Sequence, residues 1–141
     1  MKRALGIDVG KKRIGIAVSD ALGWTAQGIE TIHLKTTEPD EAFPRILELV
    51  KENEIEQLVV GLPKNMDGTI GGRGKECQAF AENLEEFSSL PVAMYDERLT
   101  TKAAERTLLQ ADVSRKKRKK VVDKMAAVMI LQSYLDHQSN L

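Results

Sequence analysis

Two apolar segments near the start of the chain, residues 4–9 and 14–19, are separated by the short connection Gly10–Arg13. Apolar residues alternate or run together in both segments, which is the pattern of two β-strands. Strands separated by so few residues form a β-hairpin. The chain is therefore predicted to begin with an antiparallel pair of strands.

The first of these strands has two unlike faces. Alternation places Ala4, Gly6 and Asp8 on one face and larger apolar side chains on the other. The apolar face supplies core, and the small residues leave space around Asp8 for a ligand. Because a carboxylate half-buried in an apolar strand needs a partner such as a metal ion, a functional role for Asp8 is favoured over that of an ordinary turn aspartate.

The rest of the chain alternates between strand and helix patterns. Further strands are predicted over 25–32, 58–62 and 91–95. Helices are predicted after Pro39, over about 75–87, from a cap at Thr100 or Thr101 through Ala111, and within or after the run 115–120. The order β-β-β-α-β-α-β-α-α, with no repeat and no linker, predicts one mixed α/β domain over residues 1–141.

Composition removes several classes of protein. The chain has 42% hydrophobic and 30% charged residues, and no stretch reaches the roughly 20 apolar residues of a membrane span. The first apolar stretch stops at Asp8, so we expect no signal peptide and a cytoplasmic protein without membrane partners. A single cysteine, Cys77, excludes an internal disulfide and a cysteine zinc cluster, and His33 and His137 share no ligand spacing.

The formal net charge of zero hides a segregation of charge. Acids outnumber bases over residues 38–56, whereas one later run is wholly basic: Arg115, Lys116, Lys117, Arg118, Lys119 and Lys120. The like charges of such a run repel one another, and bound phosphates would offset that repulsion, although charge runs are often merely solvated. Lys11, Lys12 and Arg13 would extend a phosphate-binding track past Asp8.

Two further acids are candidates to join Asp8. Glu97 follows a buried strand, at the end where open α/β sheets bind ligands, but Asp96 competes with it because adjacent strand residues face opposite ways. Asp123 shares a helical stripe with Ala126–Ala127, whose small side chains would let the helix approach the sheet, although first-turn acids are also favoured by the helix dipole. Asp8, Glu97 and Asp123 together would suit a site for two Mg²⁺ or Mn²⁺ ions, with Arg98 beside it.

The segment Lys64–Thr69 is a second candidate site. It follows the predicted buried strand and contains turn residues, so Asn65 is a candidate for contact with substrate. The interpretation as a plain turn has equal weight.

Asp8-Val9-Gly10 followed by Gly15 is also similar to the first phosphate loop of sugar kinases and actin-like ATPases. Those proteins clamp ATP between two lobes, and this chain has material for one. A small ATPase is therefore the weakest of the alternatives.

Four motifs occur in order along the chain: Gly6-Ile7-Asp8-Val9-Gly10 with Arg13-Ile14-Gly15, Val60-Gly61-Leu62-Pro63-Lys64-Asn65-Met66-Asp67-Gly68, Asp96-Glu97-Arg98-Leu99-Thr100-Thr101, and Asp123-Lys124-Met125-Ala126-Ala127. In these motifs the chain resembles the YqgF (RuvX) family over nearly its whole length. Members of that family are described as Holliday junction resolvases and as the nuclease that processes the end of pre-16S rRNA. The resemblance implies an RNase H-like fold, with a five-stranded mixed sheet flanked by helices, and an acidic site made of Asp8, Glu97 and Asp123.

The chain departs from RuvC-type resolvases at two places. Those proteins carry their second acid after the fourth strand and a further acid one turn along the last helix. Here the corresponding places are Gly61–Pro63 and Ala126 or Ala127. The site therefore has fewer carboxylates, and Glu97 must approach from the neighbouring strand.

Taken together, the residues and the resemblance predict a nuclease that uses Mg²⁺ or Mn²⁺ to hydrolyse phosphodiester bonds. Asp8 would bridge two ions and the basic residues would position the nucleic-acid backbone. Junction resolution implies branched DNA and a symmetric dimer, whereas rRNA maturation implies structured RNA in a ribosomal particle, so the sequence allows a monomer or a homodimer. The alternative from another class is a non-catalytic nucleic-acid-binding or ribosome-assembly module.

Overall fold

The computed structural model describes residues 3–96 and 115–139, with the side chains of residues 125–138 in the last helix. The elements are β1 (Ala4–Val9), β2 (Arg13–Ser19), β3 (Ala26–His33), a 3-10 turn (Pro39–Ala42), α1 (Phe43–Glu52), β4 (Gln57–Leu62), α2 (Gly72–Ser88), β5 (Val92–Asp96) and α4 (Arg115–Ser139). Every strand predicted from the sequence is present within a residue or two of its expected bounds. The helix predicted over 101–111 lies outside the described residues.

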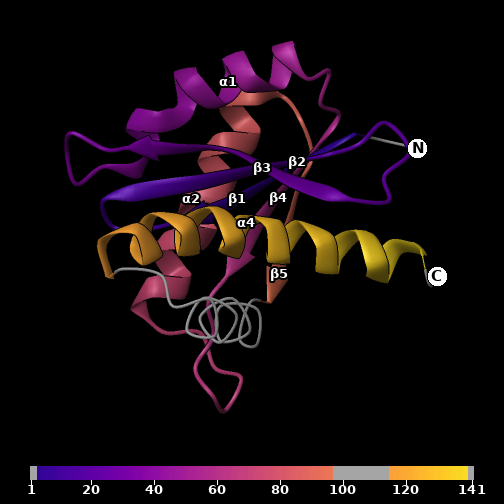
Figure 1. Ribbon diagram of the computed structural model, residues 1–141. Helices are drawn as coiled ribbons and strands as arrows, with labels where there is room; N and C mark the ends of the chain where they lie inside the picture. The colour runs from indigo at the N-terminus through magenta and orange to yellow at the C-terminus, as the bar shows by residue number, and fades with distance from the viewer. Residues whose placement is uncertain (1–2, 97–114, 140–141) are drawn as a thin grey trace.

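The five strands form one mixed sheet in the order β3-β2-β1-β4-β5 (Figure 1). β1 pairs antiparallel with β2, which confirms the predicted hairpin, and parallel with β4, which in turn pairs parallel with β5. β1 is therefore the central strand. The carboxyl ends of β1, β4 and β5 meet at one edge of the sheet, which is where open α/β sheets bind ligands.

Helices cover both faces of the sheet, with α1 on one side and α4 on the other (Figure 1). The larger core lies under α1 and α2, where Leu5 and Ile7 of β1 pack with Ile46 of α1 and Phe80 of α2. A smaller core lies under α4, where Ala4 and Val59 meet residues such as Leu131. The two faces predicted for β1 are thus confirmed, since its large residues lie in one core and its small residues face the other.

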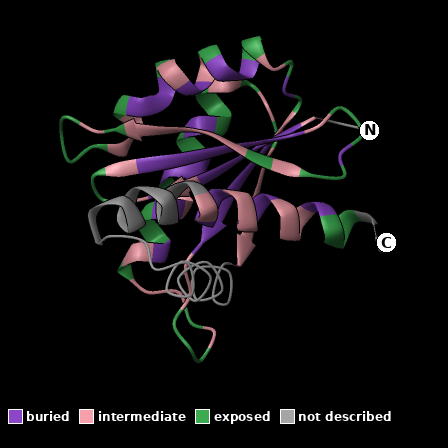
Figure 2. Cartoon of the chain, in the orientation of Figure 1, coloured by how far each residue is buried: buried purple, intermediate pink, exposed green. Residues whose placement is uncertain are grey.

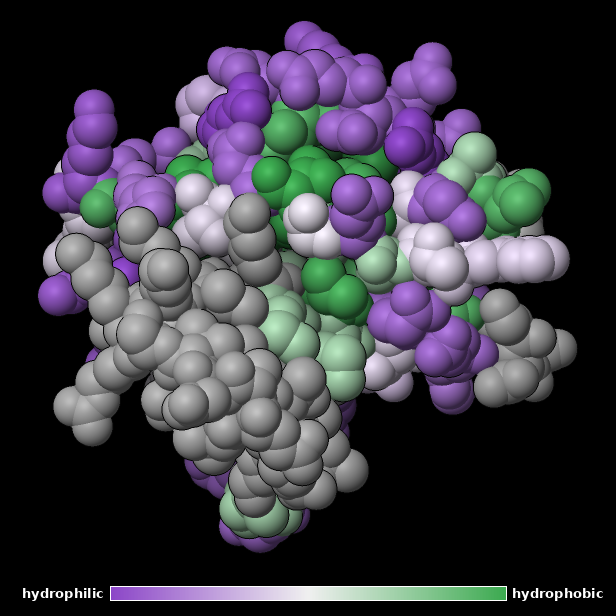
Figure 3. Space-filling model, in the orientation of Figure 1, coloured by the Kyte–Doolittle hydropathy of each residue, from purple (hydrophilic) through white to green (hydrophobic). Residues whose placement is uncertain are grey.

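The surface helix α1 carries its apolar residues on the inner side and its charges outside. Phe43, Ile46, Leu49 and Val50 are buried, whereas Leu47 is only partly buried. Figure 2 shows the buried bands of the helices turned toward the sheet, and Figure 3 shows hydrophilic side chains gathered over α1. No helix in the described part of the chain is both long enough and apolar enough to cross a bilayer.

α2 begins at Gly72, three residues before the start that its sequence predicts. The three glycines Gly71, Gly72 and Gly74 are typical of a loop, but Gly74 lies inside the helix and packs closely on the chain before it. A Cβ on Gly74 would lie 2.8 Å from the carbonyl oxygen of Pro63. The glycine is needed for close packing, and it brings the first turn of α2 to the carboxyl end of β4.

Candidate active site

Asp8 lies near the carboxyl end of the central strand and is partly buried. Its partner on β2 is Gly15, and continuing the β1–β4 register by one residue beyond Ile7–Val60 brings Gly61 alongside it. Neither neighbour has a side chain. The space that the sequence predicts around the Asp8 carboxylate therefore extends to both adjacent strands.

The short turn after Asp8 carries three basic residues. Lys11 and Lys12 are exposed, and Arg13 is partly buried at the start of β2. Alternation from Gly15 places Arg13 on the same face of the sheet as Asp8. The turn is held by a hydrogen bond from the Gly10 amide to the Arg13 carbonyl, 2.9 Å long. Basic side chains therefore lie at the sheet edge where β1 ends, just after Asp8.

The last two residues of β5 face opposite sides of the sheet. Tyr95 packs in the smaller core under α4, edge to face with Tyr134 at a centroid distance of 6.5 Å. Asp96 pairs in register with Leu62, and its Oδ2 lies 4.0 Å from the Nζ of Lys64. Asp96 is therefore on the face away from Asp8, which is the face that α1 and α2 cover.

α4 packs directly on the small face of β1. Ala126 and Ala127 are buried, as predicted, and a Cβ on Gly6 would lie 2.7 Å from the Cβ of Leu131 and 3.1 Å from the Ala127 carbonyl oxygen. Residue 123 is also part of α4, one helical turn before Ala127. The helix that carries Asp123 thus lies on the face of the sheet from which Asp8 projects.

The loop after β4 is held by its own side chains. The Asn65 side-chain amide donates to the Thr69 hydroxyl at 2.9 Å, and Asp67 accepts from the Thr69 amide at 3.0 Å and from its hydroxyl at 2.6 Å. Gly68 has φ +90°, a conformation that favours glycine. Asn65 therefore has a clear role in loop structure, and its contact with substrate stays a prediction.

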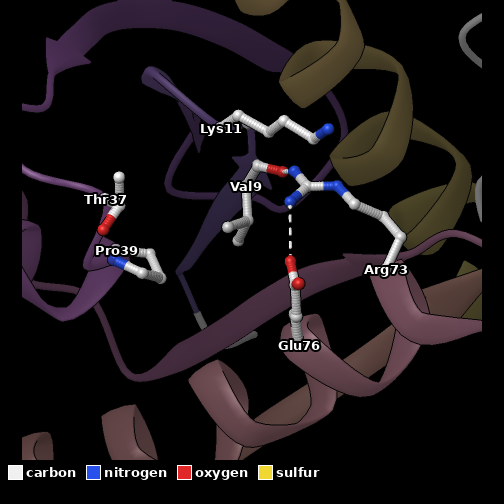
Figure 4. A pocket seen from close by; sticks show the side chains of 7 residues that line it. Val9, Lys11, Thr37, Pro39, Arg73 and Glu76 are labelled. Carbon is white, nitrogen blue, oxygen red and sulfur yellow. Dashed lines mark hydrogen bonds and ion pairs between the residues drawn. The ribbon is translucent and has the colours of Figure 1, made fainter.

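Arg73 is a residue that the sequence analysis missed. Its guanidinium reaches back from the first turn of α2 to the carbonyl oxygen of Val9, the residue after Asp8, and it pairs with Glu76 at 3.2 Å. Figure 4 shows these groups around a cavity of about 220 Å³, with Lys11 at the same wall. No sequence pattern pointed to Arg73, because the helix is predicted to begin at about residue 75, which places Arg73 in the loop before it.

A neighbouring acid fixes the far wall of this cavity. Glu41 accepts hydrogen bonds from the Lys35 amide at 2.7 Å and from the Thr36 amide at 2.8 Å, just before Thr37, which lines the cavity. The hydrogen bond from the Lys35 amide is the main reason that the pKa of Glu41 lies below its ordinary value. The Glu41 carboxylate therefore stabilises the loop between β3 and α1.

Several predicted site residues cannot be placed beside Asp8 in this way. Glu97 and Arg98 lie outside the described residues, as do the side chains of Asp123 and of the basic run 115–120. Over residues 3–96 and 125–138, whose side chains are described, no three His, Cys, Asp or Glu gather that could hold a metal ion. α4 does begin at Arg115, so the basic run belongs to that helix, in agreement with the predicted start.

The sequence as a whole matches a family model described as "RuvX: Holliday junction resolvase" over residues 2–137. Curated relatives named "Putative pre-16S rRNA nuclease" include one from Bacillus cereus strain AH187, which is 61% identical over 96% of this chain and 99% of its own length. Another, from Bacillus thuringiensis strain Al Hakam, is 62% identical over 95% of this chain and 98% of its own. These similarities extend over almost the entire chain.

Solved structures give the same answer for the fold. RuvC from Thermus thermophilus in complex with a Holliday junction substrate superposes with a TM-score of 0.60, at 16% identity, over 99% of this chain and 97% of that one. The Fowlpox virus resolvase with its Holliday junction DNA gives a TM-score of 0.58, at 12% identity, over 96% and 98%. The RNase H-like fold that the sequence resemblance implies is therefore confirmed.

Proposed function

Since this chain belongs to the RuvX family, we propose that it is a nuclease that hydrolyses phosphodiester bonds in nucleic acid with bound divalent metal ions. The observation that carries the proposal is the position of Asp8. It is a partly buried carboxylate at the end of the central strand, flanked by glycines in both neighbouring strands and followed at once by basic residues. An acid beside bases suits a metal ion and a phosphate together.

The donor set proposed for the metal consists of Asp8, Glu97 and Asp123. All three offer carboxylate oxygens, which are the ligands that Mg²⁺ and Mn²⁺ prefer. When bound, such ions supply an activated water and stabilise the leaving oxygen of a phosphodiester. The fold of this chain would hold the carboxylates together on the α4 face of the sheet, and its basic side chains would neutralise the phosphate backbone.

The faces of the strands favour Glu97 over Asp96 as the second ligand. Asp96 faces away from Asp8 and lies near Lys64. If strand alternation continues for one more residue, position 97 falls on the face of Asp8. For Asp123, the close approach of α4 at Gly6 supports the proposal, because residue 123 lies one turn before a helix residue that touches β1.

The nucleic acid would be held by basic residues at the same edge of the sheet. We assign this role to Lys11, Lys12, Arg13, Asn65, Arg98 and the run Arg115–Lys120. Contacts from such side chains position the backbone and carry little sequence information. The substrate would then be selected by its shape.

We propose the precursor of 16S rRNA as the substrate, in the cytoplasm and in the context of a ribosomal particle. The relatives that are 61% and 62% identical over almost the whole chain carry a name that refers to that RNA, which supports this choice. Holliday junction DNA is the second candidate, supported by the description of the family. Resolution of a junction would require a symmetric dimer, whereas rRNA processing is compatible with a single domain acting as a monomer.

The test is cleavage of two labelled substrates, a precursor of 16S rRNA and a four-way DNA junction, with Mg²⁺ or Mn²⁺ and with EDTA as the metal-free control. We expect the wild type to cut the RNA only with metal present, and Asp8→Asn to bind the RNA without cutting it. Circular dichroism of Asp8→Asn checks that the variant is folded. Unchanged turnover by Asp8→Asn would refute the proposed site, and binding without cutting by the wild type would favour a non-catalytic binding module instead.

A further inference from the structure

The cavity beside Arg73 is a feature of the described structure that the proposed metal site does not use. It lies at the carboxyl end of β1, on the side of the sheet away from the Asp8 side chain, because Val9 follows Asp8 and faces the opposite way. Val9, Lys11, Thr37, Pro39, Arg73 and Glu76 line it. The cavity and the proposed metal site therefore share one strand end.

Two cations and one carboxylate line this cavity. Arg73 pairs with Glu76 at 3.2 Å, and the Arg73 side chain is 35% exposed while that of Glu76 is 68% exposed. The exposed Lys11 makes no ion pair with any residue that the structure describes. The wall of the cavity therefore carries a net positive charge.

The guanidinium of Arg73 is held in place before any ligand binds. Nη2 donates to the Val9 carbonyl and Nη1 donates to Glu76, so two of its five N–H groups have acceptors among the described residues. The remaining N–H donors belong to the same planar guanidinium, whose orientation is fixed by these two hydrogen bonds. Such a group loses little entropy when it binds a phosphate, which it can do through two parallel hydrogen bonds.

The position of Arg73 at the start of a helix favours an anion at the cavity. It lies in the first turn of the 17-residue helix α2, where no acidic residue is present and where the dipole disfavours a cation. Lys75 lies in the same turn. An anion bound at the cavity would be attracted by the helix, by Arg73 and by Lys11 at once.

We propose that this cavity is a subsite for a backbone phosphate of the nucleic acid, held by Arg73 and Lys11, with Glu76 orienting the guanidinium. The inference rests on the proposed function. The bound phosphate would be next to the phosphate at Asp8 on the same nucleic-acid strand. That nucleic-acid strand would cross the end of β1 from one face of the sheet to the other. The apolar wall of Val9 and Pro39 would contact the adjoining sugar.

The experiment uses the full-length protein in EDTA, so that binding is measured without cleavage. A single-stranded RNA oligonucleotide and a DNA oligonucleotide of the same sequence are titrated over a range of salt concentrations. The variants are Arg73→Gln, Lys11→Gln and, as the matched control on the same helix, Lys75→Gln, whose side chain does not line the cavity. Losing one phosphate contact lowers the salt slope of log Kobs by about 0.7 for a single strand.

We expect Arg73→Gln and Lys11→Gln each to weaken binding about threefold to tenfold at moderate salt, with that loss of slope, while Lys75→Gln has a smaller effect and keeps the slope. If the role of Arg73 is only structural, through its hydrogen bond to the Val9 carbonyl, Arg73→Gln will be less stable in urea but will keep the salt slope of the wild type. In that case the subsite is wrong.

Neutral linkages locate the contact on the strand. Methylphosphonates placed one at a time along the DNA oligonucleotide should weaken binding by the wild type at each phosphate that a basic residue contacts, and at one of these positions the neutral linkage should cost Arg73→Gln nothing. Equal sensitivity of both proteins at every linkage would overturn the subsite. If the wild type binds neither oligonucleotide, the subsite is wrong, and it is also wrong if Arg73→Gln binds and cleaves as the wild type does. The proposed function fails separately, when the wild type cuts neither the precursor RNA nor the DNA junction with metal present.

Discussion

Gly6 is the residue through which α4 and the central strand come into direct contact. A methyl group there would lie 2.7 Å from the Cβ of Leu131 and 3.1 Å from the carbonyl oxygen of Ala127, and neither belongs to the flexible end of a side chain. Gly6→Ala must therefore push α4 outward. We expect a loss of about 1–3 kcal/mol in the free energy of unfolding, as is usual for overpacking, measured by urea denaturation.

The matched control for Gly6→Ala is Gly72→Ala, because a Cβ at Gly72 meets nothing within 4 Å. That variant should be neutral or slightly stabilising, by up to about 1 kcal/mol, since alanine restricts the unfolded chain. If Asp123 on α4 is a metal ligand, Gly6→Ala should also lower cleavage. A Gly6→Ala protein as stable as the Gly72→Ala protein would contradict the close packing of α4 on β1.

Single residues also show which features a local sequence pattern can predict and which it cannot. The alternation of Ala4, Gly6 and Asp8 with large apolar residues is a period-2 signal, so the face of Asp8 could be predicted locally. Arg73 could not be found in the same way, because its contact with Val9 joins positions 64 residues apart. Contacts of that kind follow from the packing of α2 on the sheet, which no short pattern encodes.

At the scale of elements, the sequence predicts the strands more accurately than it predicts where the helices begin. β4 is a continuous apolar run bounded by Pro63, and such a run has few alternatives to a buried strand. The start of α2 was misplaced because glycines usually mark a loop, and here Gly74 is inside the helix for close packing. Local propensity was overridden by a tertiary contact in that case.

The loop between β3 and α1 is the element whose stability depends on pH. Glu41 accepts hydrogen bonds from the Lys35 and Thr36 amides, which lower its pKa from the ordinary 4.5. A lowered pKa in the folded protein means that the charged carboxylate stabilises the fold above about pH 4.5, and that this contribution is lost as the pH falls through the lowered pKa. Glu41→Gln should therefore be less stable than the wild type at pH 7.

The difference between Glu41→Gln and the wild type should shrink as the pH is lowered below 4.5, and thermal denaturation between pH 7 and pH 3 measures it. Glu38→Gln, which changes an exposed acid three residues earlier, is the background variant. A stability difference that stays constant over this range would mean that the Glu41 carboxylate does not hold the loop.

For the molecule as a whole, a formal net charge of zero conceals a division between two surfaces. The acids around α1 lie on one face of the sheet, and Arg45 there already forms ion pairs with Glu30 at 2.7 Å and Glu48 at 2.8 Å. The exposed lysines of the β1–β2 turn lie instead at the edge beside Asp8. Nucleic acid should therefore bind by the local charge of that edge, because salt screens charges more than about 10 Å away.

Two variants with the same net charge test this division. Lys12→Gln removes one exposed cation from the turn after Asp8, and Lys51→Gln removes one from the last turn of α1. If the edge of the sheet is the binding surface, Lys12→Gln should weaken binding to a nucleic-acid duplex about threefold and reduce the salt slope by about 0.9, while Lys51→Gln keeps the slope of the wild type. Binding that depended on overall charge would weaken equally in both variants, and the edge of the sheet would then have no special role.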